Sequence, residues 1–304
     1  MAAGLWVVLL LGLVLGVGWA LRPVRTTGPT TPSQAWVAAE RHARRVTLVA
    51  WCVLIPVPLL VLALSTPLLP GVTLGAVTAA LPSLAGIGFL AVHVAGELTW
   101  PRPDGPVRRA PLVRRGIRDV APRALSVLTG VWVALLALLL VVCGAAAGTG
   151  GRSLSYAYAA GAVRTTSPFP GWYYGRWIGV PLVVLVAGTI AVLALVARRP
   201  AVADTDPADD LTLRRTSARR VLAGIQLTVA WTFAACLLVA ANAVRGVQPR
   251  WADAFGPGSS AAVASTVAVV AVAIVLAAPV VALRSSRASR VTATEAAARS
   301  QVVA

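Results

Sequence analysis

Seven long runs of apolar residues constrain this chain more than any other feature of its sequence. Each run approaches or exceeds the about 20 residues that a helix needs to cross the hydrocarbon core of a bilayer. Six of them contain no Asp, Glu, His or Arg, as lipid-facing helices require, because one charge at mid-bilayer costs about 2.5–3.5 kcal/mol. The runs cover residues 4–21, 46–65, 72–97, 124–144, 178–197, 221–243 and 261–283.

Continuous hydrophobicity over such lengths predicts α-helices, because the strands of a membrane barrel alternate in character and are about half as long. The composition agrees. Hydrophobic residues make up 58% of the 304 residues and charged residues 12%, against about 45–50% and about 25% in soluble domains. We therefore predict an all-α, polytopic transmembrane helix bundle of about seven spans over residues 1–283, followed by a short, basic, flexible tail over residues 284–304.

The arginines predict the orientation of this bundle. All 27 basic residues are Arg, and 22 of them fall in the segments 22–45, 98–123, 198–220 and 284–304, whereas five fall in the alternate segments. Positive charge concentrates on the cytoplasmic side of plasma-membrane proteins. The sequence therefore predicts an amino terminus outside and a carboxyl terminus inside. The first run is predicted to stay as a helix, because its arginines follow it, whereas a cleaved signal peptide carries positive charge before its apolar stretch.

The charge and composition also exclude several classes of function. The net charge of +17 lies between apolar runs, which favours anionic lipid headgroups over nucleic acid as the partner. The sequence contains no Lys, so no Schiff base to retinal or pyridoxal can form. Cys52, Cys143 and Cys236 each lie in a different run and are interpreted as small buried apolar residues. We expect neither a metal nor a cofactor.

The third run holds a histidine and a carboxylate four residues apart, His93 and Glu97, and this spacing places them on one helical face. The distance from Leu74 to His93 is roughly 28 Å at 1.5 Å per residue, nearly the whole bilayer core, so both lie near the inner boundary. A structural role, with Glu97 paired to a loop arginine such as Arg102 or Arg108, is the favoured interpretation. The alternative is a proton-linked or substrate-contacting role.

The outer segment 145–177 gathers all four tyrosines of the protein around a turn rich in Pro and Gly. An aromatic belt at the headgroups is the simplest interpretation. The alternative is a binding surface for an apolar or sugar-like ligand, because amphipathic rings also line such sites. Its residues are Phe169, Trp172, Tyr173 and Tyr174.

The inner segment 98–123 is interrupted by five prolines, which exclude a long helix. Val113, Ile117 and Val120 share one helical face, so a short helix lying on the membrane surface is expected. Its arginines are predicted either to contact lipid phosphates or to form a docking surface; they are Arg108, Arg109, Arg114, Arg115 and Arg118. In the next inner segment, Asp209 or Asp210 is predicted to cap the helix of the sixth span.

Three loop segments resemble those of an uncharacterised group of multi-pass membrane proteins from high-GC actinobacteria. They are Gly96-Glu-Leu-Thr-Trp-Pro-Arg-Pro103, Pro168-Phe-Pro-Gly-Trp-Tyr-Tyr-Gly175 and Leu213-Arg-Arg-Thr-Ser-Ala-Arg-Arg-Val-Leu222. The resemblance covers most of the chain and implies an integral membrane protein. It implies no activity and no site residues.

The span count, the prolines Pro56, Pro58 and Pro82 within spans and the lack of any recognisable catalytic motif favour a non-enzymatic protein. The leading hypothesis is a transporter (permease) subunit or an accessory membrane component, with a cytoplasmic ATPase or a regulatory protein as partner. Gly12 and Gly16 also favour close helix packing, within the bundle or in a homo-oligomer. One alternative is a sensor or regulator of the cell envelope, and a less favoured one is a lipid-modifying enzyme that uses His93 and Glu97.

Overall fold

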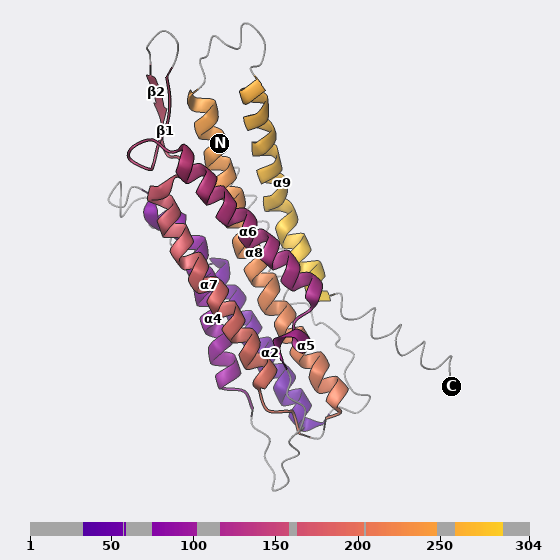
Figure 1. The fold of residues 1–304 in the computed structure, drawn as a ribbon. Helices are drawn as coiled ribbons and strands as arrows, with labels where there is room; N and C mark the ends of the chain where they lie inside the picture. The colour runs from indigo at the N-terminus through magenta and orange to yellow at the C-terminus, as the bar shows by residue number, and fades with distance from the viewer. Residues whose placement is uncertain are drawn as a thin grey trace, which may run out of the picture.

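The computed structural model describes residues 33–56, 58, 75–101, 116–157, 163–203, 205–247 and 259–287, and they form a helical bundle (Figure 1). The helices are α2 (Gln34–Leu54), α4 (Ala76–Leu98), α5 (Ile117–Val120), α6 (Arg123–Ala146), α7 (Trp172–Arg198), α8 (Pro207–Val247) and α9 (Ser259–Arg287). Two short strands, β1 (Leu154–Ala157) and β2 (Val163–Thr166), lie between α6 and α7.

Five of these helices, α4, α6, α7, α8 and α9, are long and apolar enough to cross a membrane. They correspond to the third to seventh predicted spans. The first predicted span, 4–21, lies outside the described residues. Of the second, 46–65, the structure describes 46–56 and 58, mostly as the end of α2. The prediction of a helical membrane bundle is thus confirmed, and the count of seven stays a prediction.

Helix α8 is the centre of the bundle. It contacts α2, α4, α6, α7 and α9, and Figure 1 shows it running the length of the molecule between them. Its 41 residues give it a length of roughly 62 Å, about twice the thickness of the hydrocarbon core. The charged first third of α8 therefore extends beyond any bilayer that its apolar part, from Val221 onward, spans.

The start of α8 corrects the predicted cap. The Asp206 carboxylate accepts a hydrogen bond of 2.7 Å from the backbone N–H of Ala208, and Pro207 occupies the first helical position, where its missing N–H costs nothing. Asp209 and Asp210 lie within the first turn instead. The capping residue is one turn earlier than predicted because the helix begins well before the apolar run.

The main core is formed mainly by buried residues of α2, α4, α6, α7 and α8. Phe89 of α4 is fully buried, with the ring of Trp51 edge-on at 6.0 Å between centroids. The ring of Phe89 lies so close to Gly224 of α8 that a Cβ atom at this glycine would collide with it. Small residues permit such close helix approach in membrane proteins. Gly224 therefore leaves the space on α8 that the Phe89 ring of α4 occupies.

We expect Gly224→Ala to destabilise the protein by about 1–3 kcal/mol, because the added methyl group overpacks the Phe89 contact. Gly179→Ala in α7 is the matched control, since an added Cβ there meets no atom within 4 Å, and it should change stability by at most about 1 kcal/mol. Thermal unfolding midpoints of the purified variants in detergent test this. Equal effects of the two substitutions would contradict the close crossing.

The segment 145–177, which is predicted to lie outside, contains a β-hairpin that was not predicted from the sequence. Strands β1 and β2 pair antiparallel, with Leu154 opposite Thr166, and the hydroxyls of Ser155 and Thr165 lie 2.9 Å apart. Thr166 packs on Gly246 near the end of α8. The hairpin is thereby attached to one end of the bundle (Figure 1).

The opposite end has a small core of its own. Its buried residues are Trp36, Ala39, Ala43, Trp100 and Leu213. Helix α2 begins here, twelve residues before the predicted span, because the Ser33 hydroxyl accepts the Trp36 N–H at 3.1 Å. We call this the arginine-rich end, after the exposed arginines of the segments that meet there; they are Arg41, Arg44, Arg45, Arg118, Arg123, Arg198 and Arg215.

Candidate functional site

His93 and Glu97 lie on the last two turns of α4, between the main core and the small core of the arginine-rich end. His93 is 5% exposed, and its ring packs against Phe89 with 4.6 Å between centroids. The Glu97 side chain is 8% exposed. The structure therefore places both ionisable groups inside the protein, where a charge requires a partner.

Glu97 has such a partner in Arg199, which follows directly after the end of α7. Their Oε1 and Nη1 atoms lie 3.7 Å apart, and the Arg199 side chain is 1% exposed. Arg102 and Arg108, the arginines considered from the sequence, lie outside the described residues. The ion pair joins the carboxyl-terminal ends of α4 and α7, at Leu98 and Arg198, which are far apart in the sequence.

The guanidinium of Arg199 makes two further contacts. It lies over the ring of Trp100, 4.0 Å from the centroid, within the range of a cation–π contact. Its Nη1 donates to the Ser217 hydroxyl of α8 at 3.3 Å. Burial lowers the pKa of Arg199 to about 10, and the nearby Glu97 carboxylate opposes this. Arg199 thus stays charged at neutral pH.

A second buried pair lies one layer further along α8. The Nε atom of Arg214 donates to Oδ2 of Asp210 at 2.8 Å, and the two side chains are 3% and 2% exposed. Nη1 of Arg214 donates to the carbonyls of Val196 and Ala197 at 3.1 and 3.0 Å. These are among the last carbonyls of α7, which have no partner within their own helix. Arg214 of α8 therefore supplies the hydrogen bonds that these carbonyls at the end of α7 would otherwise lack.

His42 attaches α2 to the same group of residues. Its Nε2 lies 2.9 Å from the carbonyl oxygen of Gly96. Because a carbonyl can only accept, Nε2 carries the proton and donates it. The His42 ring stands edge-on to Trp100 with 5.6 Å between centroids. We name the set Glu97, Arg199, Asp210, Arg214 and His42 the buried ionic joint.

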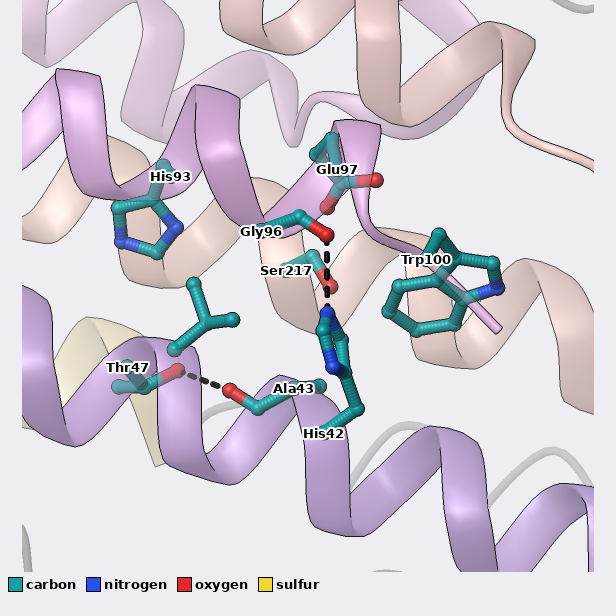
Figure 2. Close-up of a pocket in the computed structure, with 9 residues that line it drawn as sticks. His42, Ala43, Thr47, His93, Gly96, Glu97, Trp100 and Ser217 are labelled. Atoms are coloured by element: carbon teal, nitrogen blue, oxygen red, sulfur yellow. Dashed lines mark hydrogen bonds between the residues drawn. The ribbon is translucent and has the colours of Figure 1, made fainter. Parts of the chain in front are cut away.

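A small chamber opens beside the joint (Figure 2). Its volume is about 10 Å³, and it lies between α2, α4 and α8. His42 and Thr47 border it from α2, and His93, Gly96 and Glu97 border it from α4.

The candidate aromatic residues of the segment 145–177 differ in exposure. Phe169 is 3% exposed and packs with Cys143 and Ala243. Trp172 is 60% exposed, although one face of its indole covers Gly144. Tyr173 and Tyr174 are half-buried in the first turn of α7, with their rings edge-to-face at 5.0 Å. Three of the four candidate residues thus reach the surface.

Of the candidate arginines in the segment 98–123, the structure describes Arg118, which is exposed on α5. Arg108, Arg109, Arg114 and Arg115 lie outside the described residues. The expected surface helix is a single turn, α5, and its apolar side does not face outward. Val120 is 1% exposed and belongs to the main core, and α5 contacts α7 and α8.

Among the described residues, no group of three His, Cys, Asp or Glu side chains is placed to hold a metal ion. Cys143 and Cys236 are buried, as predicted, whereas Cys52 is exposed, and all three are free thiols. Comparison with known proteins gave no match: no family model, no curated protein and no solved structure is significantly similar to this chain.

Proposed function

We propose that the chain is a seven-span protein of the plasma membrane, with its amino terminus outside and its arginine-rich end in the cytoplasm. The 22 arginines of the predicted inner segments against five in the outer ones support this orientation. The arrangement of the helices also supports it, because the described parts of those inner segments meet at one end of the bundle and the β-hairpin lies at the other (Figure 1).

Within this topology, the proposed role is that of a non-enzymatic transport component, either a permease subunit or an accessory membrane protein. The observation that carries this proposal is the buried ionic joint. It ties the ends of α4 and α7 to α8 and, through His42, to α2. A cytoplasmic partner that binds the exposed arginines around the joint would act on four helices together, which is what the coupling of an energy-supplying subunit to a permease requires.

The experiment is affinity purification of the tagged chain from native membranes in mild detergent, with stoichiometry measured by mass spectrometry. The expected partner is a cytoplasmic ATPase in fixed ratio. Its binding should be lost in the charge-reversal variant Arg118→Glu/Arg215→Glu and retained in Arg176→Glu/Arg245→Glu, which reverses two arginines on the hairpin side of the bundle. Turnover of a lipid substrate by the partner-free chain would contradict the proposal.

A second candidate, a sensor of the cell envelope, is favoured by the outer end of α7. The Arg176 guanidinium lies 5.2 Å from the ring centroid of Tyr173 and 5.7 Å from that of Trp177, and Trp177 is 45% exposed. Co-purification of a histidine kinase or transcriptional regulator instead of an ATPase would favour this function. In that case, replacing Trp172, Tyr173 and Tyr174 by Ala should abolish the response.

A further inference from the structure

The chamber between α2, α4 and α8 contains two ionisable side chains that lack a protein partner on one atom each. These atoms are His93 Nε2 and Glu97 Oε2. Both side chains are more than nine-tenths buried, and both line the chamber. Leaving a buried polar atom unpaired costs about 1–3 kcal/mol, and more for a charged group.

The hydrogens of three polar groups that line the chamber are already used, and the N–H groups of Trp100 Nε1 and of Arg199 Nε and Nη2, which are unpaired, make no hydrogen bond to either atom. The Thr47 hydroxyl donates to the carbonyl of Ala43 at 2.7 Å. The Ser217 hydroxyl donates to the carbonyl of Leu213 at 3.2 Å. His42 Nε2 donates to Gly96.

The size and spacing of the chamber fit one small polar ligand. Its volume of about 10 Å³ is close to the about 10–15 Å³ that a single water requires. His93 and Glu97 are four residues apart on α4 and therefore lie on the same helical face, and both line the chamber, so that one small ligand there can contact both side chains.

We propose that the chamber is a binding site for one structural water that bridges Glu97 Oε2 and His93 Nε2. The water donates to the carboxylate oxygen. The same water donates to His93 Nε2 when that nitrogen is unprotonated and accepts from it when the nitrogen is protonated. Glu97 is thereby bound on both oxygens, to Arg199 through Oε1 and to the water through Oε2. This site does not depend on the proposed transport role.

Magnetic resonance of the full chain in lipid bilayers, with labelled histidine, tests the proposal. The sequence has two histidines, so the variant His42→Gln assigns both sets of ring signals. Magnetisation transferred from water should appear on the ring of His93, although this ring is buried. Absence of any transfer to His93 in the native chain would overturn the proposal, whatever the variants show.

Two alanines of α2, one helical turn apart, provide a matched pair of variants. Ala43 lines the chamber, so Ala43→Val should displace the water, and the transfer to His93 should be lost. Ala39 is buried in the same small core, and Ala39→Val should leave the transfer in place. Transfer that survives Ala43→Val in a folded protein would show that the water enters from elsewhere, and the assigned site would be wrong.

Discussion

Arg199→Ala is expected to destabilise the protein by about 3–5 kcal/mol, because removing one member of a buried ion pair leaves the other charge without compensation. The loss also removes the cation over Trp100 and the hydrogen bond to Ser217. Thermal unfolding of the purified protein in detergent, followed by the retention of the monodisperse peak in size-exclusion chromatography, measures the effect.

Arg198→Ala is the control, since Arg198 is the preceding residue and is exposed. Its effect should stay within about 0.5 kcal/mol. The double variant Arg199→Met/Glu97→Gln should recover most of the stability, because neither charge then remains buried. If Arg198→Ala and Arg199→Ala lowered the unfolding midpoint equally, the ion pair would not be an interior one.

Arg214→Ala should cost as much as Arg199→Ala or more. It leaves the Asp210 carboxylate without the Nε donor and deprives the carbonyls of Val196 and Ala197 of theirs. We expect a loss of about 3–5 kcal/mol. Arg214→Lys should recover only part of this, because one ammonium group on a flexible stem cannot reproduce the fixed fork of a guanidinium.

The neighbouring Arg215 provides the comparison. It is exposed, and its Nε donates to the carbonyl of Asp119 at 3.3 Å, a long surface hydrogen bond. Arg215→Ala should therefore be nearly neutral in the same unfolding assay. A larger loss of stability for Arg215→Ala than for Arg214→Ala would contradict the placement of Arg214 in the interior and Arg215 at the surface.

The membrane helices could be predicted from the sequence because their signal is local. Length and the lack of charge suffice, as in the run 124–144, which becomes α6 within two residues at each end. The helix ends were less predictable where a helix continues past its apolar run. Ser33 before α2 and the pair Asp206-Pro207 before α8 are capping signals in the sequence that mark those earlier starts.

The buried ionic joint could not be assembled from the sequence, because its pairs join segments far apart in the chain. Glu97 could be recognised as an ionisable residue at a span boundary, but nothing in the sequence distinguishes Arg199 from the exposed Arg198 as its partner. The Asp210–Arg214 pair has helical spacing and was detectable in principle. The interpretation of Asp210 as a cap obscured it.

The β-hairpin was missed for a related reason. Val163-Arg-Thr-Thr166 is a short run rich in β-branched residues, which favour strands. It lies in a segment whose aromatic residues were interpreted as a membrane belt.

The orientation of the bundle is the claim on which the proposed function rests, and site-directed thiol labelling tests it most directly. In a chain whose Cys52, Cys143 and Cys236 are replaced by Ala, single cysteines are introduced by Tyr156→Cys in the hairpin or by Arg118→Cys on α5. Both positions are exposed. We predict that a membrane-impermeant reagent labels the Tyr156→Cys variant in intact cells and labels Arg118→Cys only after permeabilisation. The reverse pattern would place the arginine-rich end outside and contradict a cytoplasmic partner at the buried ionic joint.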